Sequence, residues 1–204
     1  MNDPVNCRRR KLLFGLAALP VVGLAATDPT PAASEGPFYP LTDMRFSDID
    51  NNLVKIAGEV RQAGGEIIGL GGRVLDSTGK PVEAARVEIW QCDVNGRYLH
   101  RADSGGAERD AGFQGFGHDI TDAAGNYAFR TIKPVPYVGR TPHIHVKVMV
   151  GGRERLTTQF YLADHPQNSR DWLYRRIPQD QIERVTLRLQ ATAELPLARL
   201  DIVL

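Results

Sequence analysis

Short runs of apolar and β-branched residues recur along the chain, each bounded by a turn sequence, and this pattern indicates an all-β protein. Three turn signals share the form Asp-x-x-Gly, at Asp76–Gly79, Asp93–Gly96 and Asp122–Gly125. Asn95–Gly96 suits a hairpin turn, because both central residues of a type I′ turn need positive φ. We predict a two-sheet β-sandwich with long loops, whose strands lie at residues 87–94, 97–101, 126–132, 144–150, 184–191 and 197–204.

Helical signal is confined to one short amphipathic turn. It covers residues 171–177 and ends at Pro178, which cannot continue a helix. The sequence shows neither an internal repeat nor a low-complexity tract. We therefore expect little helix.

The N-terminal region has the pattern of an export signal. Arg8, Arg9, Arg10 and Lys11 precede the uncharged stretch Leu12–Ala26, which is shorter than the 18 or more residues of a spanning helix. We expect residues 1–26 to be a cleaved signal, 27–34 a spacer and 35–204 a single folded domain. The consecutive arginines favour the twin-arginine route to a bacterial periplasm, with no stable membrane anchor after processing. A membrane anchor or a buried N-terminal helix is the alternative.

Composition removes several classes of function. The 204 residues carry a net charge of +1, and removal of residues 1–26 would change this to −2. Such a balance gives no field to attract a nucleic acid, so no nucleic-acid partner is expected. Two cysteines cannot form a disulfide scaffold or a four-cysteine zinc site. Because Cys7 lies in the expected signal, Cys92 would remain as a lone buried thiol.

Candidate metal ligands gather around one strand. His143 and His145 are two residues apart, so a strand would present both imidazoles on one face. Tyr137 precedes them on a proline-rich approach, and Tyr98 follows the Asn95–Gly96 turn. A His-x-His pair alone also suits zinc or copper, and both tyrosines could instead be core residues with hydrogen-bonded hydroxyls.

If these four side chains converge, their chemistry narrows the choice of metal. Two phenols and two imidazoles are a poor set for zinc or copper, and they lack the carboxylate of ferrous sites. Ionising a phenol at pH 7 requires a pKa decrease of ~3 units, or about 4 kcal/mol. A trivalent, strongly Lewis-acidic ion could meet that cost, which favours Fe(III).

An ordered set of short motifs resembles the intradiol ring-cleavage dioxygenases, the family of catechol 1,2-dioxygenases and protocatechuate 3,4-dioxygenases. The motifs cover most of the expected domain. They are Glu35–Pro40, Gly72–Pro81, Ala85–Gln91, Asn95–Tyr98, Phe113–Phe116, Thr121–Asp122, Gly125–Ile132, Pro136–Tyr137, His143–His145 and Thr158–Gln159.

The resemblance implies a non-haem Fe(III) enzyme with a transthyretin-like β-sandwich. Such an enzyme inserts both atoms of O₂ into a catechol-type substrate and gives a cis,cis-muconate-type product. The implied iron ligands are Tyr98, Tyr137, His143 and His145, with Tyr137 the ligand that substrate displaces. Arg140 and Gln159 match the pair beside the bound substrate, and Tyr39 is a further candidate for the pocket. We expect a homo-oligomer.

Two other classes of function are considered. A non-catalytic transthyretin-like sandwich would share the strand–turn–strand pattern of residues 72–90, but has no reason to carry two tyrosines and a His-x-His in this order. A periplasmic copper- or zinc-binding protein could use His143 and His145. The remaining histidines, His100, His118 and His165, are expected on the surface or in loops.

The leader generates a testable prediction. Full-length protein should be processed between Ala25 and Ala33 and exported. Replacing the three consecutive arginines with lysine should block export of folded protein, as measured by fractionation and immunoblotting. Normal processing in a strain that lacks the twin-arginine translocase would leave only the general route.

Overall fold

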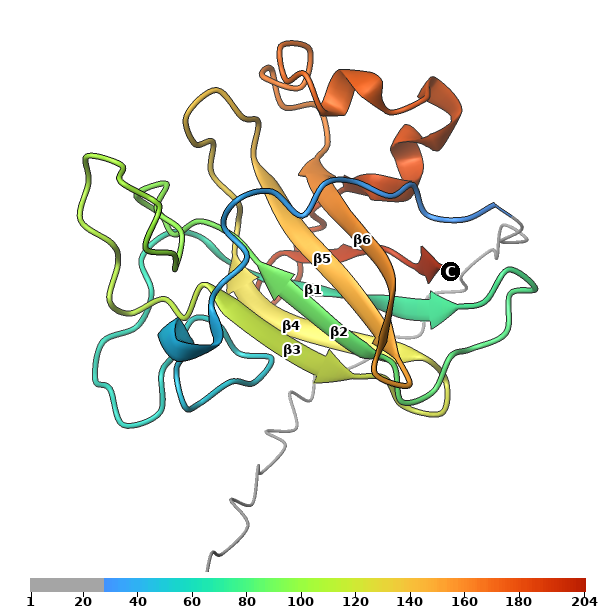
Figure 1. Ribbon diagram of the computed structural model, residues 1–204, viewed down its shortest axis with the longest axis horizontal. Helices are drawn as coiled ribbons and strands as arrows, with labels where there is room; N and C mark the ends of the chain where they lie inside the picture. The colour runs from blue at the N-terminus through green and yellow to red at the C-terminus, as the bar shows by residue number, and fades with distance from the viewer. Residues whose placement is uncertain (1–27) are drawn as a thin grey trace, which may run out of the picture.

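The computed structural model describes residues 28–204 (Figure 1). The predicted export signal lies outside these residues. Within the described range, no helix has both the length and the apolar character needed to cross a membrane.

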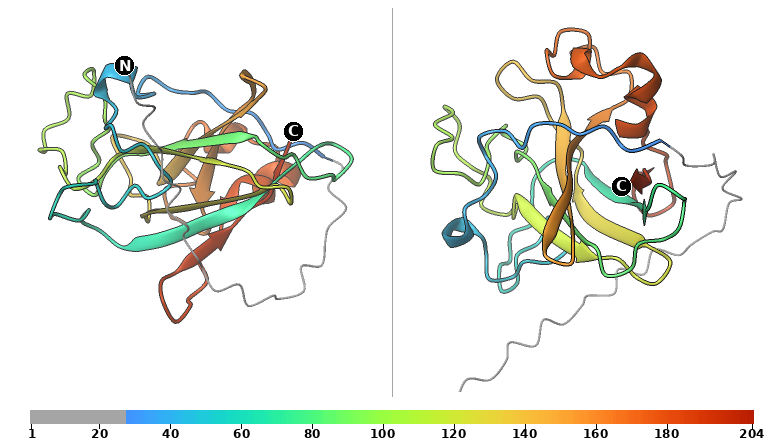
Figure 2. Two further views of the ribbon diagram at one scale, coloured as in Figure 1. Left: turned by 90° about the horizontal axis from the view of Figure 1, so that it is seen from below. Right: turned by 45° about the vertical axis from the view of Figure 1, so that its right-hand side comes forward.

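Two β-sheets pack face to face, which confirms the predicted all-β sandwich (Figures 1 and 2). The first sheet has the order β4 (Asn126–Ile132), β1 (Ile67–Leu75) and β8 (Leu197–Arg199), and β9 (Ile202–Val203) also pairs with β1. The second has the order β3 (Phe116–Ile120), β2 (Arg86–Trp90), β5 (His143–Val150), β6 (Arg153–Leu162) and β7 (Thr186–Leu187). Three short 3₁₀ helices complete the described fold: η1 (Thr42–Met44), η2 (Tyr174–Arg176) and η3 (Gln179–Val185).

Strand β5 is buried on both of its faces. Ile144, Val146 and Val148 are fully buried and face the core between the sheets. His143 and His145 alternate with them, so they point away from that core, yet they are also buried. The outer face of this sheet must therefore be covered by other parts of the chain.

The segment of residues 28–40, called the strap below, provides part of this cover. It crosses the outer side of β5 and β6 (Figure 1). The amide of Ala33 donates to the carbonyl oxygen of Thr157 (2.8 Å), and the Thr158 hydroxyl donates to the carbonyl oxygen of Pro31 (2.7 Å). An ion pair joins Glu35 to Lys147. The strap is thus fixed against the face that carries both histidines.

The three Asp-x-x-Gly signals form turns of one design. In each, the Oδ1 atom of the aspartate accepts the amides of the second and fourth following residues, at 2.8–3.0 Å. The glycines Gly79, Gly96 and Gly125 have φ between 74° and 79°, a region that glycine adopts without strain. The turn predictions are confirmed.

The hairpin predicted at Asn95–Gly96 is wrong. Residues 97–101 contain no strand, because β2 already has β3 on one side and β5 on the other. With both edges of β2 occupied, the chain after the turn leaves the sheet. It carries Tyr98 inward instead of pairing it.

The other strand predictions vary in accuracy. The strand at residues 126–132 is confirmed, and the strand at 144–150 begins one residue earlier, at His143. Residues 184–191 contain only β7, since η3 occupies their start, and residues 197–204 hold two short strands. Of the turn expected at residues 171–177, only η2 is helical.

Two strands, β3 and β6, lie outside the predicted set. In β6, residues 156–162 are buried on both faces, so no alternation of apolar and polar residues marks the strand. In β1, which was anticipated only from Gly72 onward, glycines interrupt the pattern of side chains.

The tight approach of two chain segments at Gly72 generates a stability prediction. A Cβ atom there would lie 1.9 Å from the carbonyl oxygen of Leu200, which is backbone and cannot rotate away. We expect Gly72→Ala to reduce the free energy of unfolding by about 3 kcal/mol, the upper part of the usual overpacking range. Gly106→Ala is the control, because a Cβ there has no neighbour within 4 Å. Urea unfolding should show a loss for Gly72→Ala alone, and equal stabilities would contradict the account.

Candidate metal centre

The two histidines of β5 face each other closely enough to share a ligand. Their Nε2 atoms are 3.1 Å apart. The Nδ1 atom of His143 lies 2.7 Å from the carbonyl oxygen of Thr141, which can only accept, so Nδ1 carries the proton. The Nε2 lone pair of His143 is therefore directed into the space between the two rings.

Both tyrosines join this pair, although each comes from a different loop. Tyr98 follows β2, and its amide donates to the Asp103 carboxylate at 2.6 Å. Its hydroxyl lies 3.4 Å from Nε2 of His143. Tyr137, in the loop before β5, has its ring centroid 5.1 Å from that of Tyr98 and 5.7 Å from that of His143. The structure thus brings together all four side chains predicted as ligands.

Burial keeps these groups neutral when no cation is present. It lowers the pKa of His143 to about 4, with a further contribution from Arg140, and lowers the pKa of His145 well below its usual value. It raises the pKa of Tyr98 well above the ordinary range. The pKa of Tyr137 is also raised by burial, but the Arg140 guanidinium opposes that shift.

The donor set fits a hard, highly charged cation. Two neutral imidazoles and two phenol rings lie in one cluster, and a cation bound among them would favour ionised phenols. Among residues 28–204, no group of three or more histidine, cysteine, aspartate or glutamate side chains could hold a metal. Any metal at this place would therefore depend on the tyrosines.

Two residues fix the orientation of the His145 ring. The Trp90 indole stacks on it, with ring centroids 4.7 Å apart and planes 11° from parallel. In the strap, Gly36 lies so near that a Cβ atom would be 3.4 Å from Cε1 of His145. The sequence analysis assigned no role to either residue. Both belong to motifs quoted there, Ala85–Gln91 and Glu35–Pro40, but pattern alone does not reveal a ring contact.

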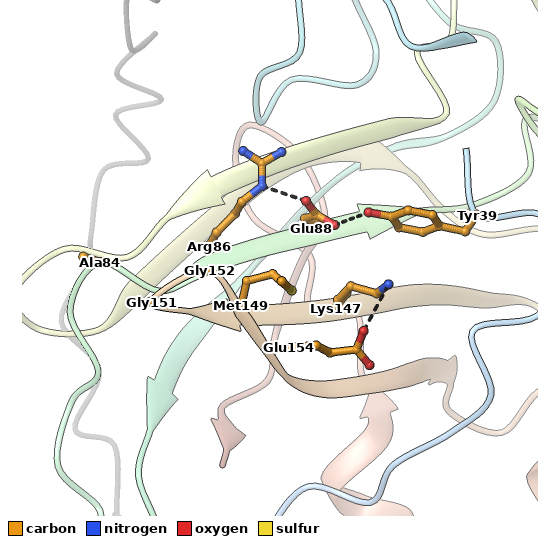
Figure 3. Close-up of a pocket in the computed structure, with 9 residues that line it drawn as sticks. All are labelled: Tyr39, Ala84, Arg86, Glu88, Lys147, Met149, Gly151, Gly152 and Glu154. Atoms are coloured by element: carbon orange, nitrogen blue, oxygen red, sulfur yellow. Dashed lines mark hydrogen bonds and ion pairs between the residues drawn. The ribbon is translucent and has the colours of Figure 1, made fainter. Parts of the chain in front are cut away.

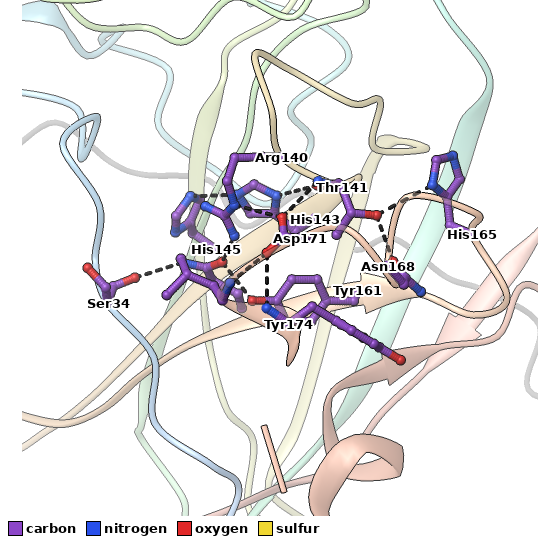
Figure 4. Close-up of polar contacts among 12 residues, drawn as sticks. Ser34, Arg140, Thr141, His143, His145, Tyr161, His165, Asn168, Asp171 and Tyr174 are labelled. Atoms are coloured by element: carbon purple, nitrogen blue, oxygen red, sulfur yellow. Dashed lines mark hydrogen bonds and ion pairs between the residues drawn. The ribbon is translucent and has the colours of Figure 1, made fainter. Parts of the chain in front are cut away.

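Arg140, which lies beside the histidines in Figure 4, forms a hydrogen-bonded pair with Gln159. Nη2 of Arg140 donates to Oε1 of Gln159 at 2.7 Å. The same oxygen accepts from the Tyr161 hydroxyl at 2.9 Å, and Nε2 of Gln159 donates to the carbonyl oxygen of Ser34 at 2.8 Å. Gln159 is also the cross-strand partner of His145. The two residues predicted as a pair are therefore in direct contact.

Tyr39 occupies a different place from the other candidates. Its hydroxyl donates to Oε2 of Glu88 at 2.6 Å, in a charged trough of about 290 Å³ on the outer face of the same sheet (Figure 3). Lys147 lies 4.1 Å from its ring centroid. The edge of Tyr39 also meets Trp90, with centroids 5.0 Å apart. Tyr39 is thus linked to His145 through Trp90, which contacts both rings.

The other singled-out residues lie outside the cluster of four ligands. Cys92 is buried, as expected, and burial raises the pKa of its thiol to about 12, which leaves it unreactive. His100 and His165 lie in loops. His118 departs from the expectation, because it is half-buried on β3 and burial lowers its pKa to about 4.

Known proteins resemble this chain in sequence and in structure. The family model described as Dioxygenase matches residues 34–204. The protocatechuate 3,4-dioxygenase beta chain of Burkholderia cepacia is 36% identical over 160 residues, covering 74% of this chain and 67% of that protein. Catechol 1,2-dioxygenase of Candida albicans is 36% identical over 121 residues, covering 50% of this chain and 39% of that protein.

A solved structure supports the same relationship. It is the dioxygenase domain of a dioxygenase and carbohydrate-binding protein fusion from Streptomyces sp. SirexAA-E. It superposes with a TM-score of 0.64 at 32% identity, covering 87% of this chain and 98% of that one. By contrast, this chain spans only 39–52% of the length of the matched catechol and hydroxyquinol 1,2-dioxygenases.

The lowered pKa of His143 generates a pH prediction for the metal-free protein. The folded state takes up this proton near pH 4, whereas the unfolded state takes it up near pH 6.5, so stability falls as the pH decreases between these values. The expected loss from this histidine is about 3 kcal/mol.

Urea unfolding at pH 7 and at pH 4.5 measures this effect. His143→Gln should lose less stability between the two pH values than the wild type does. His100→Gln, which replaces a loop histidine, is the control and should follow the wild type. Parallel curves for His143→Gln and the wild type would contradict the pKa assignment.

Proposed function

The chain belongs to the intradiol ring-cleavage dioxygenases, and on that basis we propose that it is an Fe(III)-dependent enzyme that cleaves a catechol-type substrate with O₂. The observation that carries this proposal is the convergence of Tyr98, Tyr137, His143 and His145 in one buried space. A non-catalytic sandwich would not need such a set. Neither alternative class is favoured by the relatives, which are named as dioxygenases.

The four side chains would hold the iron through two imidazole Nε2 atoms and two phenolate oxygens. Bound Fe(III) would supply a Lewis acid to which both catechol oxygens can bind, and this would make the ring reactive towards O₂. The chain holds these ligands in fixed orientations. The His145 ring packs against Trp90 and Gly36. His143 is oriented by its bond to Thr141.

The two tyrosines would have unequal roles. Tyr98 is only 2% exposed, and its backbone is fastened by Asp103, so it suits a permanent ligand. Tyr137 is half-buried and stands in the turn closed by the bond from the Arg140 amide to its carbonyl oxygen, at 2.7 Å. We assign Tyr137 as the ligand that substrate displaces. Its phenolate oxygen would then accept one of the two catechol protons.

Arg140 would stabilise negative charge that develops on the substrate during the reaction. Its guanidinium opposes the rise in the pKa of Tyr137 that burial causes, so its positive charge favours the ionised form of that hydroxyl. The cation is planar and held by Gln159, and a fixed charge needs no reorganisation as the reaction proceeds.

The substrate class follows from the relatives. Their printed names concern protocatechuate, catechol and hydroxyquinol, all of which have two adjacent ring hydroxyls. We propose a catechol with a muconate-type diacid as product. We also propose export to the periplasm and a homo-oligomeric state, in keeping with the leader sequence and the sequence-based expectation.

Oxygen uptake by the iron-loaded protein tests this function. A panel of catechol, protocatechuate and hydroxyquinol is mixed with the enzyme, and the products are identified by mass spectrometry and NMR. We expect consumption of one O₂ per ring and cleavage between the two hydroxyl-bearing carbons. No uptake with any catechol, or cleavage beside the hydroxyls, would overturn the proposal.

The unequal roles of the tyrosines generate a prediction. Tyr98→Phe should lose iron to a chelator at least about tenfold faster than the wild type, because a permanent ligand is missing. Tyr137→Phe should retain iron and still bind a catechol without oxygen, but remove its second proton about 10²-fold more slowly. Anaerobic stopped-flow absorption measures both steps. Wild-type kinetics in Tyr137→Phe would show that Tyr137 is not the displaced ligand.

A further inference from the structure

Asp171 is a buried carboxylate that belongs to none of the assigned groups. It is 1% exposed and lies just before η2. Its Oδ2 atom accepts from Nε of Arg140 and from the amide of Thr141, both at 2.8 Å (Figure 4). Its Oδ1 atom accepts from the amides of Leu173 and Tyr174, both at 2.9 Å. One carboxylate therefore ties the turn that carries Arg140 to the loop that leads into η2.

These contacts fix the direction of the Arg140 side chain. Asp171 binds Nε and Gln159 accepts from Nη2, so two partners define the plane of the guanidinium. An arginine side chain has several rotatable bonds. A single hydrogen bond from Nη2 to Gln159 would leave the guanidinium free to rotate about that bond.

We propose that Asp171 is the positioning residue that aims Arg140 at the substrate, an inference that rests on the proposed function. Asp171 itself touches no iron ligand among its hydrogen-bond partners, and it acts through Arg140. Its negative charge neutralises the guanidinium, which lets that cation remain in a site where its side chain is only 11% exposed. Without the carboxylate, Arg140 would keep its charge, but its guanidinium would no longer be held in one orientation.

Asp171→Asn tests the proposal with little change in shape. The amide can keep the Oδ1 contacts to Leu173 and Tyr174, but an NH₂ group would replace the acceptor that faces Arg140 and the Thr141 amide. Asp201→Asn, between β8 and β9, is the matched control. Asp201 likewise accepts from an arginine, at the amide (2.9 Å), Nε (3.2 Å) and Nη2 (2.7 Å) of Arg73.

Steady-state kinetics and absorption spectra should separate the two variants. We expect Asp171→Asn to retain iron and its visible absorption band while kcat falls about 10²-fold and KM changes less than about threefold. A loss of this size is typical of a reacting group that is misplaced by about 1 Å. Asp201→Asn should keep wild-type kcat. An Asp171→Asn enzyme with kcat within threefold of the control would overturn the proposal.

A double-mutant cycle tests whether Asp171 acts through Arg140. In an Arg140→Lys background, adding Asp171→Asn should lower kcat by no more than about threefold, because the guanidinium that Asp171 orients is already absent. A further loss near 10²-fold would show that Asp171 acts independently of Arg140 and would overturn the proposal.

The metal-free wild-type protein provides a readout that does not depend on activity. In ¹⁵N NMR spectra, the Nε–H of Arg140, identified by its loss in Arg140→Lys, should exchange slowly with water because it is bonded to a buried carboxylate. Exchange as fast as that of exposed arginines would overturn the proposal. If slow exchange is found but no catechol is cleaved, the proposed function fails while the contact stands, so the two failures are distinguishable.

Discussion

The two imidazoles of β5 are buried, and their Nε2 atoms lie 3.1 Å apart. The segments that cover β5 must accommodate this close pair of polar rings. A sheet face buried by loops would ordinarily carry apolar side chains, since polar groups lose their hydration there. Here two imidazoles on this face lie beside two phenols from neighbouring loops, and burial disfavours the charged forms of His143, His145 and Tyr98. A cation that binds all of them would offset this cost, which supports the proposal of a metal site.

The rest of the chain serves to close and orient this face. The strap crosses β5 and β6, and its Gly36 packs against His145. The carbonyl oxygen of Ser34, also in the strap, accepts a hydrogen bond from Gln159. The turn at Asp93 directs Tyr98 away from the sheet and into the site. Phe38 of the strap lies with its ring centroid 5.2 Å from that of Tyr98 and 6.2 Å from that of Tyr137. Segments that are distant in sequence thus pack together around the two histidines and the two tyrosines.

The sequence pattern predicted the features that depend on neighbouring residues, namely the face of a strand and the position of a turn. The period of a strand places His143 and His145 on one face, and each Asp-x-x-Gly signal encodes its own turn. The strand expected after Asn95–Gly96 failed, because the sheet positions beside β2 were taken by strands from elsewhere in the chain. The convergence of the two tyrosines followed from resemblance rather than from spacing. Long-range contacts such as Trp90 on His145, or Asp171 on Arg140, leave no periodic signal at all.

Resonance Raman spectroscopy of the iron-loaded protein, excited in its visible absorption band and combined with metal analysis, tests the central claim most directly. The account predicts one high-spin ferric ion per chain and enhanced tyrosinate ring vibrations, because phenolate-to-iron charge transfer would produce the band. A protein that binds stoichiometric zinc or copper instead, or that takes up iron without visible absorption and without tyrosinate vibrations, would contradict it.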